Sequence, residues 1–349
     1  MAEPDKIRVE LPKERSLVYR NWIDVMARRF EKAIPFPGPA HAVLTLGSGV
    51  SESLSELDLR DTVTVPFSQI GLPEGANEKH PKTIVAGYTV DNRLTVVFTG
   101  RTALFEIPPE GVNVETGHVQ ATEAAGAYLE LVKRMGTENL ILTTACGGIN
   151  HPMLPFGRPP FNKKDLPIIG VIGANVSIGY PMEHMGFYKA DHGTFFALQD
   201  SDDDLTAAFI QSMGEVAPGI KVPILYYASI PAVFEDRALA HFLAVNGVQA
   251  IGMTYGPESI HRSGIRKGNP GESNRIGRSM GIAVITDDVE LYDPRHPNRL
   301  TPISALELRF RRPQEFKIRN PATDDQVRAT AALASQRLGK ALNHLIRNI

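Results

Sequence analysis

The stretch His41-Ala-Val-Leu-Thr-Leu-Gly-Ser-Gly-Val50 joins a short apolar run to a glycine turn, and it predicts the core of the fold. The run at 42–46 is typical of a buried strand. After Gly47-Ser48-Gly49, residues 51–57 are expected to begin a helix, so backbone N–H groups and a helix dipole converge on the turn. Such a turn is a candidate anion site, although taken alone it is equally typical of a tight connection between a strand and a helix.

Apolar runs of this kind recur along the chain and alternate with helical patterns. This alternation is typical of a parallel or mixed sheet covered by helices, so the predicted fold class is α/β. The runs at 83–87 and 94–99, with Asp91-Asn92 between them, predict a hairpin. The expected strands are 42–46, 83–87, 94–99, 140–144, 168–172, 222–227, 248–253 and 282–286, and the expected helices are 119–134, 236–246 and 324–347.

The composition excludes several classes of protein. The 349 residues are 42% hydrophobic and 22% charged, which is ordinary for a globular protein with a sizeable core. With 37 basic and 39 acidic residues the net charge is −2, so no extended basic surface for nucleic acid or an anionic membrane is expected. An anionic ligand must therefore be small and locally bound.

The predicted location is cytoplasmic. The first ten residues are charged and lack the apolar segment of a signal peptide. The longest uncharged stretch, residues 166–182, is interrupted by Pro167 and several glycines, so it predicts a buried strand with a loop rather than a membrane span. The one cysteine, Cys146, fits a reducing compartment and is expected to be a small buried side chain rather than a nucleophile.

Three loops rich in proline, glycine or basic residues interrupt the pattern, near residues 152–164, 263–278 and 292–321. None of them separates two regions of different composition, so residues 1–349 are predicted to form a single domain. The loop at 263–278 is interpreted as a surface excursion in preference to an active-site lid.

Residues with phosphate-binding chemistry gather at the predicted strand ends. In α/β sheets, ligands bind outside the carboxyl ends of the strands. There the sequence places hydroxyls, glycine-rich backbone and one arginine, whose planar fork matches an oxyanion. The segments are Gly47-Ser48-Gly49, Gly100-Arg101-Thr102, Thr143-Thr-Ala-Cys-Gly-Gly148, Gly252-Met253-Thr254 and Thr286-Asp287-Asp288.

On its motifs the chain resembles the purine nucleoside phosphorylase family, in the trimeric branch that includes the methylthioadenosine phosphorylases. The motifs occur in family order along most of the chain. They are Leu46-Gly-Ser-Gly49, Lys79-His80-Pro81 with Ile84-Val-Ala-Gly87, Phe98-Thr-Gly-Arg101, Leu142-Thr-Thr-Ala-Cys-Gly-Gly-Ile-Asn150, Val233-Phe-Glu235, Gly252-Met-Thr254 and Ile285-Thr-Asp287. The resemblance implies a mixed, partly barrel-like central sheet flanked by helices, and a homotrimer.

The resemblance also implies roles for single residues. Phosphate is expected at Ser48, Arg101, Thr102, the backbone of Ala145 and Thr254, with His80 beside them. The nucleoside is expected at Phe234, Glu235, Met253 and Asp287. In this arrangement Met253 lies under the ribose, Glu235 faces the pyrimidine edge of the purine, and Asp287 meets N7 and the 6-substituent. The implied catalytic residues are Asp287 and His80.

These roles agree with the chemistry of N-glycosidic cleavage, which builds positive charge on the sugar and negative charge on the departing purine. Phosphate held by Ser48 and Arg101 would supply the nucleophile, and a protonated Asp287 would neutralise the base at N7. A thioether such as that of Met253 packs on the ribose without competing for its hydroxyls. The predicted reaction converts a purine nucleoside and phosphate to free purine and ribose 1-phosphate, with no cofactor besides the co-substrate phosphate.

The sequence departs from the family pattern in the phosphate and sugar sites. Thr102 and Ala103 stand where the two branches carry a phosphate-binding histidine, and the Thr102 hydroxyl is expected to substitute in part. Phe105 replaces a tyrosine that contacts the ribose, and Ala174-Asn-Val-Ser177 replaces Asp-His-Ile-Asn.

Several alternatives stay open. Glu235 resembles the branch that takes 6-oxopurines and Asp287 the 6-aminopurine branch, so an adenine-type base is favoured with hypoxanthine or guanine possible. The missing histidine motivates a phosphate-independent hydrolase or an atypical glycosyl transferase on the same fold. A nucleoside-binding protein without turnover is the third hypothesis.

Two other groups of acidic and histidine residues are assigned no catalytic or metal-binding role. Glu183-His184 and Asp191-His192 fit no zinc-ligand spacing, so they predict a loop and no metal site. The run Asp202-Asp203-Asp204 precedes an apolar segment and predicts the N-terminus of a helix, where carboxylates complement the dipole.

Overall fold

The computed structural model describes residues 13–36, 39–47, 49–75, 81–103, 106–108, 110–149, 166–177, 201–230, 239, 242–243, 246–256, 258, 276–289 and 324–349. Within these residues, nine strands form one sheet in the order β10-β9-β8-β11-β7-β1-β4-β3-β2. The strands are β1 (Ala42–Thr45), β2 (Arg60–Pro66), β3 (Thr83–Tyr88), β4 (Leu94–Phe98), β7 (Asn139–Ile149), β8 (Ile168–Ser177), β9 (Ile224–Ser229), β10 (Ala250–Gly252) and β11 (Arg278–Val289).

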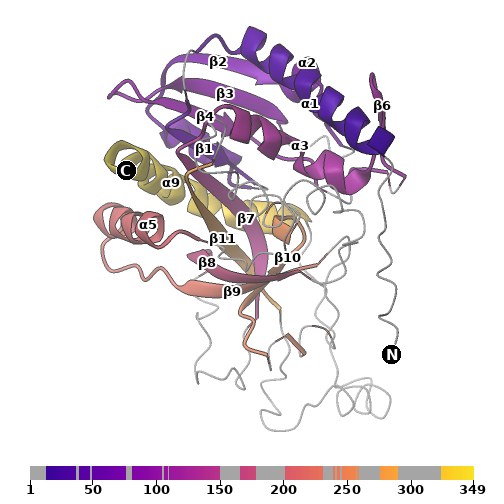
Figure 1. The fold of residues 1–349 in the computed structure, drawn as a ribbon. Helices are drawn as coiled ribbons and strands as arrows, with labels where there is room; N and C mark the ends of the chain where they lie inside the picture. Colours follow the sequence, from indigo (N-terminus) through magenta and orange to yellow (C-terminus); the bar gives the residue numbers. More distant parts are fainter. Residues whose placement is uncertain are drawn as a thin grey trace, which may run out of the picture.

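Part of this sheet is closed. Strand β10 pairs with β9 and also, antiparallel, with the second half of β7, so β7, β11, β8, β9 and β10 make a ring. The strands β1, β4, β3 and β2 extend from β7 as an open flank (Figure 1). Both parallel and antiparallel pairs occur, for example β1 with β4 and β3 with β4. The predicted α/β class and the mixed, partly barrel-like sheet are confirmed.

Helices cover both faces of the sheet. Figure 1 shows α1 (Lys13–Ala33) and α3 (Ala121–Arg134) on one side and α5 (Asp203–Val216) and α9 (Asp324–Asn348) on the other. The core divides in the same way, because neighbouring strand residues point to opposite faces. Val43 packs with the cluster that includes α1 and α3, whereas Leu44 packs with the cluster that includes α5 and α9.

Two buried tyrosines pack against strands of the ring. Tyr227 and Tyr255 are fully buried and meet edge to face, with ring centroids 5.6 Å apart. A Cβ at Gly281 on β11 would lie only 2.4 Å from the Tyr255 hydroxyl oxygen, so this position must be glycine. These side chains therefore pack closely against the glycines of β10 and β11.

Most predicted elements are confirmed, with differences in length. Strands β3 and β4 form the predicted hairpin, and Asn92 in its turn has a positive φ of 59°. Helix α5 begins as predicted, because the Asp202 carboxylate accepts the Leu205 N–H at 3.1 Å. Strands β7, β8 and β11 are longer than their apolar runs, since pairing around the ring continues them through glycine and polar residues.

Some elements differ from the sequence analysis or were absent from it. Residues Ser51–Glu56 form a short 3-10 helix, η1, where an ordinary helix start was expected. Helix α1, strand β2, the one-turn helix α2 (Phe67–Ile70), and the small hairpin of β5 (Val112–Val114) and β6 (Gly117–Val119) were not predicted.

Several predicted features fall outside the described residues. These are the loops near 152–164 and 292–321, the loop at 263–278 except for its last three residues, most of the helix at 236–246, and the Glu183-His184 and Asp191-His192 pairs. That residues 1–349 form one domain stays a prediction. No helix in the described part of the chain is long and apolar enough to cross a membrane.

Candidate functional site

The carboxyl ends of four strands meet at one edge of the sheet. Strand β1 is parallel to β4 and to β7, and β7 is parallel to β11. The glycine turn after β1, Arg101 after β4 and Asp287 on β11 are therefore delivered to the same edge. Strand β10 runs antiparallel to β7. Thr254, which follows β10, nevertheless lies near the middle of β7, because its hydroxyl is 3.1 Å from the hydroxyl of Thr144.

The glycine turn lies directly against Arg101. A Cβ at Gly47 would stand 2.8 Å from the carbonyl oxygen of Thr143 and 3.0 Å from Nη2 of Arg101, so only glycine allows this approach. The Gly47 N–H already donates to Oγ1 of Thr143 at 3.0 Å, and that hydroxyl donates to the carbonyl of Thr45 at 2.9 Å. The first amide of the turn is thus used within the protein. Ser48 lies outside the described residues.

Arg101 is buried and bonded at both ends of its guanidinium. Its side chain is 6% exposed; Nη1 donates to Oε2 of Glu258 at 2.7 Å, and Nη2 donates to Oγ1 of Thr254 at 2.6 Å. Glu258 is 2% exposed, and its other carboxylate oxygen accepts the hydroxyl of Tyr128. Buried charges are stable only when paired and hydrogen-bonded, and both conditions hold here.

The loop after Arg101 is fixed by a second buried ion pair. The Lys82 ammonium bonds Oε2 of Glu106 at 2.7 Å and also the backbone carbonyl of Arg101, and the Ala103 N–H donates to the same carboxylate oxygen at 3.0 Å. Burial lowers the pKa of Lys82, while the hydrogen bond and charge of Glu106 oppose that shift. Lys82 has a positive φ of 47°, a conformation that costs energy for a residue with a side chain.

The Thr102 hydroxyl is hydrogen-bonded to a backbone group outside the glycine turn. It donates its one proton to the backbone carbonyl of Pro73. The expected partial replacement of the family histidine by this hydroxyl therefore requires that bond to open first. Ala103 brings no polar side chain to this position.

Asp287 lies at an irregularity in β11. The pairing of β11 with β7 shifts register between Ile285 and Asp287, which re-aims the side chains that follow. The hydroxyl of Thr286 lies 3.0 Å from Oδ1 of Asp287 and 3.2 Å from the carbonyl oxygen of Cys146, and its proton is shared between the two. Burial raises the pKa of Asp287, and the hydrogen bond from Thr286 opposes the rise. A raised pKa favours the protonated form, which can donate a proton to a ligand.

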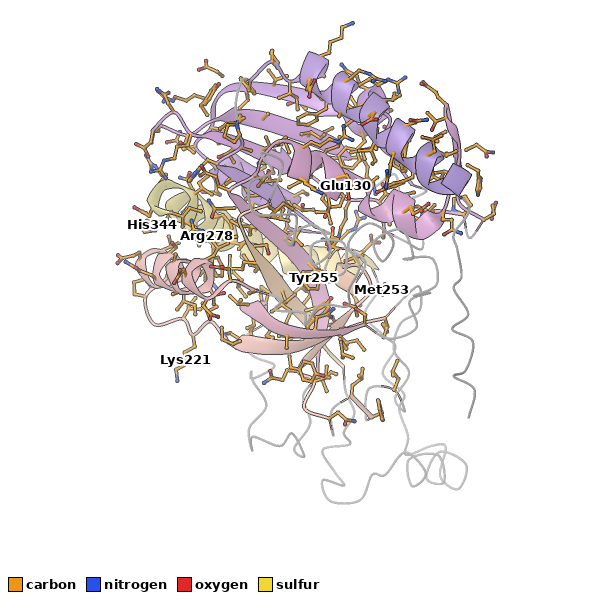
Figure 2. All side chains as sticks on the ribbon, viewed as in Figure 1. Glu130, Lys221, Met253, Tyr255, Arg278 and His344 are labelled. Atoms are coloured by element: carbon orange, nitrogen blue, oxygen red, sulfur yellow. The ribbon has the colours of Figure 1, made fainter. Side chains whose placement is uncertain are left out.

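The residues expected from the sequence to bind the nucleoside lie only in part within the described chain. Figure 2 shows Met253 and Tyr255 at the end of β10, with Arg278, the first residue of β11, away from them. Met253 is half-buried and packs on the cluster that includes Ile251. Of the sequence-predicted residues, His80, Phe234 and Glu235 lie outside the described residues, as does Phe105.

The β8 segment that departs from the family pattern is polar after all. Asn175 accepts a hydrogen bond from the Ser229 hydroxyl at 2.8 Å and donates to the Ser177 hydroxyl at 3.1 Å. The first of these bonds joins β9 to β8, and the second lies within β8. Cys146 is buried, as expected from the sequence.

Four buried residues around Arg101 were not singled out from the sequence. They are Lys82, Glu106, Tyr128 and Glu258. One signal was available for Glu258: an arginine predicted at a buried strand end needs a counter-charge, and Glu258 follows Thr254 by four residues, one helical turn. Tyr128 gave no such signal, because an aromatic residue on the apolar side of a helix is ordinary core.

No family model matches the chain. "Purine nucleoside phosphorylase 1" of Bacillus subtilis (strain 168) is 28% identical over 252 residues, which are 67% of this chain and 80% of that protein. The chain is related to the purine nucleoside phosphorylases. The protein of the same name from Geobacillus stearothermophilus is 25% identical over 233 residues, or 64% of this chain and 73% of that protein. The resemblance seen in the sequence motifs is thereby confirmed.

Solved structures of purine nucleoside phosphorylases share the fold. The Schistosoma mansoni enzyme in complex with adenosine has a TM-score of 0.64 at 17% identity, and the comparison covers 95% of this chain and 97% of that one. The same enzyme in complex with inosine has a TM-score of 0.65 at 15% identity, covering 94% and 96%. The closed ring with an open flank is thus the architecture of purine nucleoside phosphorylases.

Proposed function

We propose that the protein cleaves the N-glycosidic bond of a purine nucleoside with inorganic phosphate. The observation that carries this proposal is the position of Arg101, a buried guanidinium against the glycine turn, with Thr254 and Thr144 hydroxyls beside it. A fixed fork with hydroxyls and backbone amides is the chemistry that binds a phosphate. The named relatives, which are purine nucleoside phosphorylases, support the same reaction.

In the proposed reaction a phosphate oxygen forms a bond to C1′ of the sugar while the bond between C1′ and the purine nitrogen breaks. The bonding electrons leave with the purine, and Asp287 in its protonated form gives a proton to N7. The products are free purine and a pentose 1-phosphate. Burial of Asp287 supports this role, because it raises the pKa of the acid toward the working range of pH.

The proposed phosphate site consists of Ser48, Arg101, Thr102, the backbone of Ala145, and Thr254, with His80 nearby. The proposed nucleoside site consists of Phe234, Glu235, Met253 and Asp287. Phosphate is the co-substrate and no other cofactor is invoked. A cytoplasmic homotrimer is proposed from the single cysteine and from the family branch that the motifs resemble.

The purine is proposed to be of the adenine type, with hypoxanthine and guanine as competing choices. A carboxylic acid at 287 can donate to N7 and accept from an exocyclic amine through its two oxygens. Crystal structures of the Schistosoma mansoni enzyme contain adenosine and inosine, and a further Schistosoma structure contains guanosine, so this fold accommodates all three nucleosides.

A hydrolase is the second candidate, and specific observations favour keeping it. Ala103 offers no side-chain donor, Thr102 donates to Pro73, and Arg101 already carries a carboxylate partner. Each of these weakens the attraction of the site for phosphate, so water could take its place as nucleophile.

The test is a screen of adenosine, inosine and guanosine, each with and without phosphate, with free base as the readout. Phosphorolysis predicts base release that requires phosphate and saturates with it. Release that is unchanged without phosphate would establish the hydrolase, and nucleosides that bind but stay intact would establish a binding protein.

A further inference from the structure

Glu258, the ion-pair partner of Arg101, carries a negative charge next to the proposed phosphate site. A carboxylate 2.7 Å from the guanidinium neutralises the cation that should attract phosphate. If attraction were the whole requirement, Glu258 would weaken the site, because the opposing charges are buried where solvent screens them little. The presence of Glu258 needs a different explanation, and the geometry supplies one.

The guanidinium of arginine is planar and rigid, so holding one of its ends sets the direction of the other. Glu258 holds Nη1, while Nη2 reaches Oγ1 of Thr254 at 2.6 Å and faces the glycine turn. Without Glu258, the long side chain of Arg101 would have other rotamers available, and binding phosphate would have to pay the entropy of fixing one of them.

Glu258 is itself held from the opposite side. Tyr128 on α3 donates its hydroxyl to Oε1 of Glu258. The Tyr128 ring packs on Phe98 at the end of β4, with centroids 5.2 Å apart, so the donor is fixed to the strand that delivers Arg101. Burial and the carboxylate of Glu258 raise the pKa of Tyr128 well above its ordinary value, so the hydroxyl stays a donor.

We propose that Glu258 is a positioning residue, whose carboxylate, held by Tyr128, orients the Arg101 guanidinium so that Nη2 and Thr254 together face the phosphate site. This inference rests on the proposed function, because it assigns phosphate to Arg101. It makes the shape of the residue at 258 more important than its charge. Two conservative variants separate these properties.

The variants are Glu258→Gln, which keeps the length and an acceptor oxygen but removes the charge, and Glu258→Asp, which keeps the charge but shortens the side chain by one methylene. For both, the KM for phosphate, the KM for the nucleoside and kcat are measured, together with the Kd of inorganic phosphate by calorimetry. Glu115→Gln and Glu115→Asp serve as matched controls, because Glu115 forms an exposed ion pair with Arg29 away from the site.

Positioning predicts that Glu258→Asp raises the KM and Kd for phosphate at least about tenfold, since a misplacement of about 1 Å has effects of this size or larger. In both variants the nucleoside KM stays within about twofold of its original value. Glu258→Gln changes the phosphate KM by less than about threefold, because its uncharged acceptor oxygen keeps the hydrogen bond that orients Arg101. A phosphate KM that rises as much in Glu258→Gln as in Glu258→Asp would overturn the inference, and so would variants that lower only the melting temperature.

If Glu258→Asp does not fold, Tyr128→Phe decides the question, since it removes one hydrogen bond to Glu258 and no charge. The expected result is a phosphate KM raised about threefold with an unchanged nucleoside KM, in line with the loss of one ordinary hydrogen bond. An unchanged phosphate KM would overturn the inference. Phosphate dependence of base release in the unsubstituted protein is measured first. If base release does not depend on phosphate, the proposed function is wrong. If base release depends on phosphate but Glu258→Gln and Glu258→Asp raise the phosphate KM equally, only this inference is wrong.

Discussion

The proposed phosphate side and the proposed purine side of the site are built in different ways. Arg101 is bonded by residues from distant parts of the chain, Thr254 beyond β10 and Glu258, which Tyr128 on α3 holds in turn. Asp287 is bonded by its neighbour Thr286, and its protonation is governed by burial. The difference indicates that the proposed phosphate side depends on contacts between elements far apart in the chain, whereas the proposed purine side depends on a local hydrogen bond and on partial burial. Changes on the two sides should therefore have different consequences.

The largest effect is expected for Arg101→Met. Phosphate-dependent base release should fall to background, and the unfolding free energy should drop by about 3–5 kcal/mol because Glu258 is left as a buried unpaired charge. Denaturant unfolding and phosphate titration measure the two losses. The double variant Arg101→Met with Glu258→Gln should recover most of the stability and none of the phosphate dependence. Recovery of phosphate-dependent turnover in the double variant would contradict the assignment of Arg101.

Asp287→Ala should separate turnover from binding. Loss of a general acid is expected to lower kcat by about 10²–10⁴-fold, while the Kd of inorganic phosphate stays unchanged because the hydrogen bond found for Asp287 joins it to Thr286 and not to Arg101 or Thr254. Single-turnover rates and calorimetry provide the comparison. Equal losses in nucleoside binding and in turnover would show that Asp287 is a binding group and not the acid.

Gly47→Ala should damage the phosphate side alone. The new Cβ would lie 2.8 Å from the Thr143 carbonyl oxygen and 3.0 Å from Nη2 of Arg101, so the guanidinium or the turn must shift. A rise of about tenfold in the phosphate KM is expected, with the pH dependence of kcat unchanged. The control is Gly214→Ala on α5, where a Cβ meets nothing within 4 Å. An unaltered phosphate KM in Gly47→Ala would contradict the close approach of the turn to Arg101.

The smallest effect is expected for Thr286→Val, which acts on the purine side. Its hydroxyl lowers the pKa of Asp287, so removing it should raise that pKa further. In the proposed reaction the protonated acid is the active form, so activity should be lost as pH rises through its pKa. The alkaline limb of the kcat profile should therefore move to higher pH. A limb that moves to lower pH would show that Asp287 acts as a carboxylate.

Local sequence patterns predict the strand ends, whereas the closure of the sheet was predicted only through the family resemblance. The apolar run of β1 and the hydroxyl-rich end of β7 are local patterns, and the parallel pairing of these strands brings both ends to the same edge of the sheet. Closure of the ring depends on Ala250 and Ile251 pairing with Gly148 and Gly147, and a pair of glycines carries no hydrophobic pattern that could predict it. Arg101 was found from its motif, but Glu258 and Tyr128 act through contacts between elements far apart in sequence.

The most direct test of phosphorolysis follows both products while phosphate is titrated. The protein is incubated with its best nucleoside, and free purine and the sugar product are measured at each phosphate concentration. Phosphorolysis at Arg101 predicts a pentose 1-phosphate formed in equal amount to the free purine, with a rate that saturates with phosphate and loses this saturation in Arg101→Met. Free pentose, released at a rate that does not change with phosphate, would contradict the assignment.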